Sequence, residues 1–255
     1  MTDIVNVLII RMGTNTVLCE SREYNIYVII VVAKACNTHL ALPEYDYVLR
    51  IARWIYLRIG EEMLDFIQNL DVNILYFIQD NLRTPFLNEF MTHFTSLGNG
   101  GLIWITLTLI MLIYPKTRKA GACSAISIIL CFLTVNLGIK NIVARTRPYD
   151  TYELIRCIIK PAVDYSFPSG HSAIAFATVL PIYFQLGKKW GIPFMLAALL
   201  MAASRLYVCV HYPSDVLCGM IFGVVCAVVA CKLIYPRLIG EKINSQMQRV
   251  HRKNR

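Results

Sequence analysis

The sequence predicts an all-α fold, a polytopic bundle of about five to six membrane helices. The 255 residues are 56% hydrophobic and only 16% charged, whereas a soluble domain carries roughly 25% charged residues. Several apolar runs approach the length that crosses a bilayer. Short clusters of polar residues lie at the edges of these runs, where a charge is costly unless it has a function.

Residues 1–62 are predicted to be an N-terminal extension outside the membrane domain. The apolar stretch Asn25–Ala35 is too short to span a bilayer, and no standard signal peptide is visible. Met63 begins a segment typical of a natural start, and Gly60–Glu62 before it is compatible with a ribosome-binding site read as protein. Two interpretations stay open: an upstream mis-start with Met63 as the true first residue, or an interfacial extension. A peptide mapped upstream of Met63 in the native protein would exclude the mis-start.

The membrane domain, residues 63–238, is predicted to begin with two amphipathic helices. Leu64–Arg83 has apolar residues at helical spacing, interrupted by aspartates that include Asp71. This pattern is typical of a helix at the membrane interface or against the bundle. Phe86–Leu97 has the same character and is ended by the helix breaker Gly98–Gly101.

Five apolar runs follow and are predicted to be membrane helices, although some are shorter than the roughly 20 residues usually needed. In order they are Leu102–Tyr114, Ala122–Ile139, His171–Leu186, Ile192–Val210 and Asp215–Tyr235. The last run has small residues at every fourth position: Gly219, Gly223 and Ala227. We interpret this stripe as close packing within the bundle in preference to a dimer contact. The oligomeric state is not predicted.

The distribution of charge predicts the orientation in the membrane. Of 25 basic and 16 acidic residues, only six and seven fall in residues 1–62, so nearly all of the net charge of +9 follows them. The basic turns Lys116–Lys119 and Lys188–Lys189 and the basic tail 239–255 fall on one side, which the positive-inside rule places in the cytoplasm. The polar clusters then lie on the extracytoplasmic side. The excess charge suits membrane lipids with anionic head groups, and no nucleic-acid partner is expected of a mostly embedded chain.

The nine cysteines form no C-x2-C pair, and most lie in apolar runs, where cysteine acts as a small hydrophobe. No disulfide framework, zinc site or other metal or cofactor site is predicted. The candidate chemistry therefore lies in three clusters, K-x6-R-P, P-S-G-H and S-R-x5-H-x3-D.

The first two clusters are predicted to bind an anion. Lys140 and Arg147 are about two helical turns apart, so both cations can face the same way and bind phosphate oxygens. Ser169 and Gly170 open an apolar helix, where free N–H groups form an anion site. Ser169 can cap the helix and donate its hydroxyl, Gly170 permits close approach, and His171 is placed to protonate a leaving oxygen. Alone, each cluster is equally compatible with interfacial charges or a plain capped helix.

The third cluster is the most specific of the three. Arg205 lies within an apolar run and should face the bundle interior. His211 and Asp215 are four residues apart, and Tyr212–Ser214 supplies a turn that brings them together. Asp215 can accept the proton of one imidazole nitrogen, which leaves the other nitrogen free to attack phosphorus. A structural His–Asp pair is the alternative, and the combination with the other two clusters argues against it.

With these motifs in this order, the sequence resembles the type 2 phosphatidic acid phosphatases, or PAP2 superfamily. The resemblance covers roughly Met63 to Tyr235 and includes all signature positions. It implies a PAP2/haloperoxidase-like helical bundle and hydrolysis of phosphomonoester or diphosphate bonds without metal or cofactor. It implies that His211 is a nucleophile that forms a phosphohistidine, that Asp215 orients it, and that His171 is the general acid. The phosphate would be held by Lys140, Arg147, Ser169, Gly170 and Arg205.

The implied substrate is a lipid phosphate that enters from the membrane, and our first choice is undecaprenyl pyrophosphate. Phosphatidylglycerol phosphate and phosphatidic acid are the alternatives. A membrane protein that binds lipid phosphates without turnover is an alternative of another class, disfavoured because all three catalytic side chains are present. Transport would need polar groups through the midplane of the membrane, whereas these gather at one end.

Overall fold

The computed structural model describes residues 8–12, 15–19 and 42–238 of the chain. Contacts divide the chain into two units, Met1–Phe66 and Ile67–Arg255. The first unit contains an antiparallel hairpin of β1 (Leu8–Met12) and β2 (Asn15–Cys19). Helix α2 (Leu42–Asn81) continues through Met63 without a break. Asn25–Ala35 and the basic tail 239–255 lie outside the described residues, so the predicted boundaries stay predictions.

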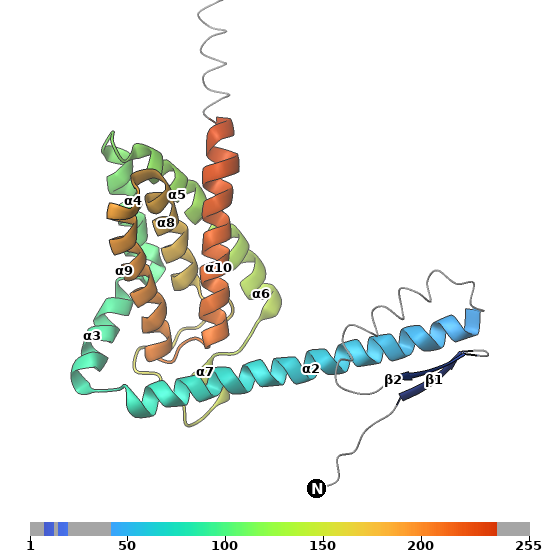
Figure 1. Ribbon diagram of the computed structural model, residues 1–255. Coiled ribbons are helices and arrows are strands. Elements are labelled where there is room, and N and C mark those ends of the chain that lie inside the picture. The colour runs from blue at the N-terminus through green and yellow to red at the C-terminus, as the bar shows by residue number, and fades with distance from the viewer. Residues whose placement is uncertain (1–7, 13–14, 20–41, 239–255) are drawn as a thin grey trace, which may run out of the picture. The chain divides into compact units, whose positions relative to one another are not determined.

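In its described part, the second unit has helices as its regular elements and no strand, as predicted (Figure 1). Both expected amphipathic segments and all five apolar runs form helices. After α2, the α-helices are α3 (Pro85–Ser96), α4 (Leu102–Ile113), α5 (Arg118–Cys131), α6 (Lys140–Val143), α7 (Pro148–Thr151), α8 (Gly170–Leu186), α9 (Lys188–Tyr207) and α10 (Pro213–Val229). A 3-10 turn, η1 (Asn99–Gly101), precedes α4, and the π-helical segments η2 (Phe132–Ile139) and η3 (Ala230–Ile234) follow α5 and α10.

Three helical stretches of the described chain are long and apolar enough to cross a membrane: Arg118–Thr151, Lys188–Tyr207 and Pro213–Leu238. A fourth results if α3 and the following helix, which meet at a bend of 48°, form one broken span. Helix α8 has 17 residues, or about 25 Å at 1.5 Å per residue. It is therefore shorter than the roughly 30 Å hydrocarbon core of a bilayer.

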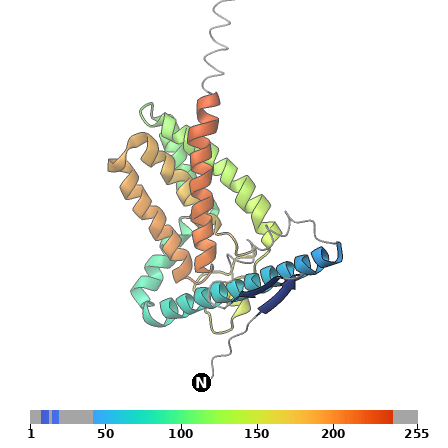
Figure 2. The ribbon, with the colours of Figure 1, turned by 45° about the vertical axis from the view of Figure 1, so that its right-hand side comes forward.

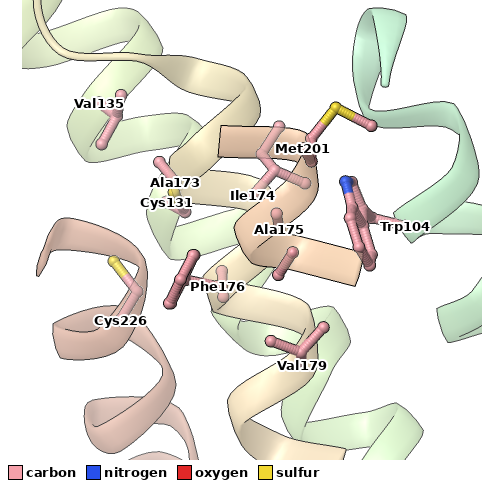
Figure 3. Packing of buried hydrophobic residues seen from close by; sticks show 12 residues of the cluster. Trp104, Cys131, Val135, Ala173, Ile174, Ala175, Phe176, Val179, Met201 and Cys226 are labelled. Atoms are coloured by element: carbon pink, nitrogen blue, oxygen red, sulfur yellow. The ribbon is translucent and has the colours of Figure 1, made fainter. Parts of the chain in front are cut away.

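Helix α8 forms the centre of the bundle and packs against α5, α9 and α10. Its residues Ala173–Ala177 are all buried, and small and large side chains alternate there in close contact with the neighbouring helices. Figure 3 shows Trp104 of α4, Val135 of η2 and Met201 of α9 around this helix. A helix that is apolar all round is typical of such a buried position.

The small residues of α10 pack against α8, which confirms the predicted role of this stripe within the bundle. A Cβ atom on Gly219 would lie 2.5 Å from the carbonyl oxygen of Ser169. Gly223 lies against the carbonyl oxygen of Ala173 in the same way. Because real Cβ contacts are never this short, a larger side chain at either position would push α10 away from the first turns of α8.

Candidate active site

The three polar clusters meet at one end of the bundle, where α9 ends and α10 begins (Figures 1 and 2). The loop between α7 and α8 ends at the same place. Its last residue, Ser169, donates its N–H to the main-chain oxygen of Asp215 at the start of α10 (3.0 Å). A cavity of about 950 Å³ opens there. Six of the eight predicted site residues line it: Lys140, Arg147, Gly170, His171, Arg205 and His211. The two others, Ser169 and Asp215, are fully buried beside it.

Lys140 and Arg147 are brought together by a turn in the chain and by a shared carboxylate. The two helical turns expected between them are wrong, because α6 ends at Val143 and Ala144 adopts a left-handed conformation (φ 48°). Both side chains nevertheless face the same cavity, as expected. Asp164 forms an ion pair with Lys140 Nζ and accepts a hydrogen bond from Arg147 Nη2 (2.6 Å). Burial by itself would raise the pKa of Asp164, but Lys140 and Arg147 lower it to about 2.

The start of α8 is built as predicted, with Ser169 as its cap. The Ser169 hydroxyl caps the helix, accepting from the Ser172 N–H (3.5 Å) and the Ser172 hydroxyl (3.0 Å). It is buried and is not among the cavity-lining residues. Gly170 does line the cavity, and a Cβ there would lie 3.1 Å from Asn136 Oδ1. The absence of a side chain thus keeps the helix start open beside Asn136.

The predicted turn brings His211 and Asp215 together. Pro213 begins α10, and Asp215 caps its first turn by accepting from the Tyr212 N–H (3.0 Å). The Nδ1 atom of His211 is 3.7 Å from Asp215 Oδ2 and 3.4 Å from Ser166 Oγ, which itself donates to Asp215 (2.5 Å). Burial lowers the pKa of His211 to about 3, although Asp215 opposes that shift. The imidazole is therefore neutral at physiological pH, with Nδ1 on the side of the carboxylate.

Arg145 is a site residue that the sequence reasoning missed. Its Nη1 donates to Asp215 Oδ1 (2.5 Å), and its Nη2 donates to Asp71 (2.8 Å) and Gln68 (2.5 Å) of α2. The guanidinium also lies 3.8 Å from the ring centroid of Tyr212. The sequence did contain a signal for a functional Asp71, because this charged residue interrupts an apolar helical pattern. In the structure its side chain is buried.

Two further contacts from α3 and η1 also escaped the sequence reasoning. Arg205 Nη1 donates to Thr95 (2.6 Å), while its buried Nε has no partner within the described residues. His171 Nε2 lies 3.3 Å from Asn99 Oδ1. Neither Thr95 nor Asn99 has a sequence pattern that marks it, since both depend on where the bend between α3 and α4 places them.

The cavity has an apolar side as well as a charged end. Its lining includes Ile105 of α4, Ile128 and Ile129 of α5, and Phe132 and Leu133 of η2. Ile105, Ile129, Phe132 and Leu133 are also exposed, as expected for side chains that face lipid. One cavity therefore joins cations and imidazoles to a surface that favours hydrocarbon, which suits an amphiphilic anion.

Comparisons with known proteins agree with this geometry. The family model described as the PAP2 superfamily matches residues 120–238. An undecaprenyl-diphosphatase from Sulfolobus acidocaldarius is 28% identical over 71% of this chain and 88% of its own length. Phosphatidylglycerophosphatase B from Bacillus subtilis is 33% identical over 56% of this chain and 72% of its own length.

A solved structure supports the same assignment. It is that of a transmembrane PAP2-type phosphatidylglycerolphosphate phosphatase from Bacillus subtilis, with a TM-score of 0.56 and 25% identity. The match covers 76% of this chain and 96% of that one. The comparisons favour the enzyme over a protein that binds lipid phosphates without turnover, because these relatives are phosphatases by name. The chain belongs to the PAP2 superfamily and is a membrane lipid phosphatase.

Proposed function

We propose that the enzyme hydrolyses its lipid substrate through a covalent phosphohistidine at His211. The observation that carries this proposal is the placement of His211, neutral and beside the cavity, with Nδ1 toward Asp215. Nε2 is then the nitrogen that attacks phosphorus. The bond between phosphorus and the lipid-bearing oxygen breaks, and His171 donates its proton to that oxygen. Water then cleaves the phosphohistidine, with His171 as the base, and orthophosphate is released.

The charge that develops on the phosphoryl oxygens is balanced by protein groups in this proposal. Lys140, Arg147 and Arg205 supply three cations, and the N-terminus of α8 at Gly170 supplies backbone N–H groups. Ser169 contributes by fixing that helix start. Phosphoryl transfer depends mainly on positioning and electrostatic stabilisation. These groups provide part of the charge stabilisation that a metal ion provides in other phosphatases.

We further propose undecaprenyl pyrophosphate as the substrate. The apolar side of the cavity suits a long hydrocarbon chain, and the Sulfolobus acidocaldarius relative is an undecaprenyl-diphosphatase. Phosphatidylglycerol phosphate is the second candidate, favoured by the two Bacillus subtilis relatives. Phosphatidic acid, which shares a monoester phosphate with it, is the third.

The test is phosphate release by the full-length protein in detergent with EDTA, with the three lipids compared at equal mole fraction in mixed micelles. We expect release to survive EDTA, because the proposed groups are all side chains and backbone, and kcat/KM to be highest for undecaprenyl pyrophosphate. A higher kcat/KM for either glycerolipid would overturn the substrate proposal. Loss of all release in EDTA would overturn the metal-independent mechanism.

We propose that the active site faces the extracytoplasmic side and that the C-terminal tail is cytoplasmic. The basic turns Lys116–Lys119 and Lys188–Lys189 support this orientation through the positive-inside rule. The start of α10 carries Asp215, and the described chain ends at Leu238, beyond the other end of this helix (Figure 1). A reporter fused after Arg255 that is active only outside the cytoplasm would contradict the orientation.

The proposed roles of the two histidines predict a bell-shaped dependence of kcat on pH, because His211 must be neutral and His171 protonated in the substrate complex. Burial holds the pKa of His211 at about 3, so this group loses its nucleophilic form only well below neutral pH. Burial, with Arg205 and the other neighbouring cations, also lowers the pKa of His171 to about 2 in this structure. In the proposed mechanism the negative charge of the bound phosphate group raises that pKa, so the alkaline limb, expected between about pH 5 and 9, belongs to His171 of the substrate complex. His171→Gln should lower the rate and remove that limb. A profile that is flat over this range in the unmutated enzyme would contradict the roles.

A further inference from the structure

Asp164 pairs with two of the cations that line the cavity. It lies in the loop between α7 and α8 and lines the cavity. One carboxylate oxygen, Oδ2, pairs with Lys140, and the other, Oδ1, accepts from Arg147 (2.6 Å). Each carboxylate oxygen thus binds one of the two cations. Two oxygens of a phosphoryl group would bind the same two cations in this way.

Arg147 does not depend on this carboxylate for its position. Its Nε donates to the main-chain oxygen of Asp164 (2.8 Å), and its Nη1 donates to the main-chain oxygen of Val210 (2.7 Å). Both acceptors are backbone oxygens, so these two bonds persist if the Asp164 side chain rotates away. Only Nη2, which faces Asp164 Oδ1, then changes its main partner.

The carboxylate is on the open side of the cations. The side chain of Asp164 is 52% exposed, whereas those of Lys140 and Arg147 are 9% and 3% exposed. A side chain that is half in solvent can leave with little disruption of packing. A ligand that enters the cavity therefore reaches the two buried cations by replacing Asp164.

If Asp164 and a phosphate group both bound Lys140 and Arg147, their negative charges would lie in close contact. Although burial opposes it, the two cations lower the pKa of Asp164 to about 2. The carboxylate is therefore ionised at every pH at which the enzyme would be assayed. It competes with phosphate under all of these conditions, and protonation does not remove it.

Given the proposed role of Lys140 and Arg147 in holding phosphate, we propose that Asp164 is an internal counter-ion that substrate displaces. Its carboxylate pairs with both cations in the empty site, moves aside when the phosphoryl group binds, and returns as orthophosphate leaves. It weakens the binding of phosphate groups and thereby favours product release. The residue limits affinity for any phosphorylated ligand, and orthophosphate is the simplest such ligand.

Orthophosphate affinity of the detergent-purified protein tests this proposal, measured by calorimetry and as a shift in melting temperature. Asp164→Asn should bind orthophosphate about tenfold more tightly than the unmutated protein. Without phosphate it should melt at a lower temperature, because two buried cations have lost their counter-ion, and phosphate should restore more stability than in the unmutated protein. In turnover assays the KM for lipid substrate and the Ki for orthophosphate should both fall.

Asp150→Asn is the matched control, since Asp150 is exposed in α7 and forms no ion pair with either cation in the described part of the chain. It removes the same charge and should leave phosphate affinity unchanged. Equal or weaker phosphate binding by Asp164→Asn, or equal tightening in both variants, would overturn the proposal. If Asp164→Asn fails to fold, Asp164→Ser takes its place with the same expectations.

The binding measurement does not depend on turnover, so the two proposals can fail separately. An unmutated protein that releases no phosphate from any of the three lipids would refute the proposed function. The same protein could still show the difference in orthophosphate affinity between Asp164→Asn and Asp150→Asn. If the unmutated enzyme is active and Asp164→Asn has unchanged phosphate affinity, only the counter-ion proposal is refuted.

Discussion

His211→Ala is expected to abolish phosphate release, with a fall in kcat of at least about a thousandfold. The imidazole is the proposed nucleophile. Asp215 and Ser166 lie on its Nδ1 side, away from the proposed line of attack through Nε2. The measurement is orthophosphate release in detergent with EDTA. It should be paired with acid-quench trapping of the phosphoryl-enzyme, which the variant should not form.

The matched control is His93→Gln, because His93 is exposed on α3 and away from the cavity lining. It should keep the activity and the phosphoryl-enzyme of the unmutated protein. A second variant, His171→Gln, separates the two histidines. It should slow turnover but still form the phosphoryl-enzyme when the leaving group is a good one that needs no proton. Phosphoryl-enzyme in His211→Ala would show that another residue is the nucleophile.

The sequence predicted the helices and most of the site because both depend on local patterns. Apolar runs predicted α4, α5, α8, α9 and α10, since a membrane helix needs a continuous apolar stretch. The turn before α10 predicted the approach of His211 to Asp215, because the two residues are only four apart. The small residues at Gly219 and Gly223 predicted close packing for the same local reason.

Long-range contacts account for what the sequence reasoning missed. Asp164 lies 24 residues after Lys140 in an irregular loop, and no periodic pattern predicts where such a loop returns. Asp71 and Arg145 are separated by 74 positions, so their pairing depends on how α2 packs. Ser169 was expected both to cap α8 and to donate its hydroxyl to phosphate. The cap is confirmed, whereas the side chain is buried and does not line the cavity, because a cap and a phosphate ligand have the same sequence signature.

Arg145→Gln is expected to lower both stability and catalysis. Asp71 and Asp215 are 3% and 0% exposed, and both pair with this one guanidinium. Removal of a cation from a buried charge network costs about 3–5 kcal/mol, because the remaining charges are left unpaired. The melting temperature in detergent should therefore fall by several degrees. Arg156→Gln, an exposed arginine in the loop after α7, is the matched control and should melt like the unmutated protein.

The catalytic effect of Arg145→Gln should fall on kcat more than on KM. Arg145 contacts Asp215 and not the cations proposed to hold phosphate, so an enzyme assayed below its lowered melting temperature should keep its KM within a few-fold. Its kcat should fall about a hundredfold, since Asp215 loses its charged donor and is then held behind His211 by the Ser166 hydroxyl and the Tyr212 N–H. Asp71→Asn removes the other carboxylate and leaves the bond from Arg145 to Asp215 intact, so its kcat should fall much less.

Equal losses in Asp71→Asn and Arg145→Gln would mean that the network stabilises the fold alone. A selective loss of kcat in Arg145→Gln would instead mean that Arg145, two positions before the arginine proposed to bind phosphate, positions the proposed nucleophile through Asp215.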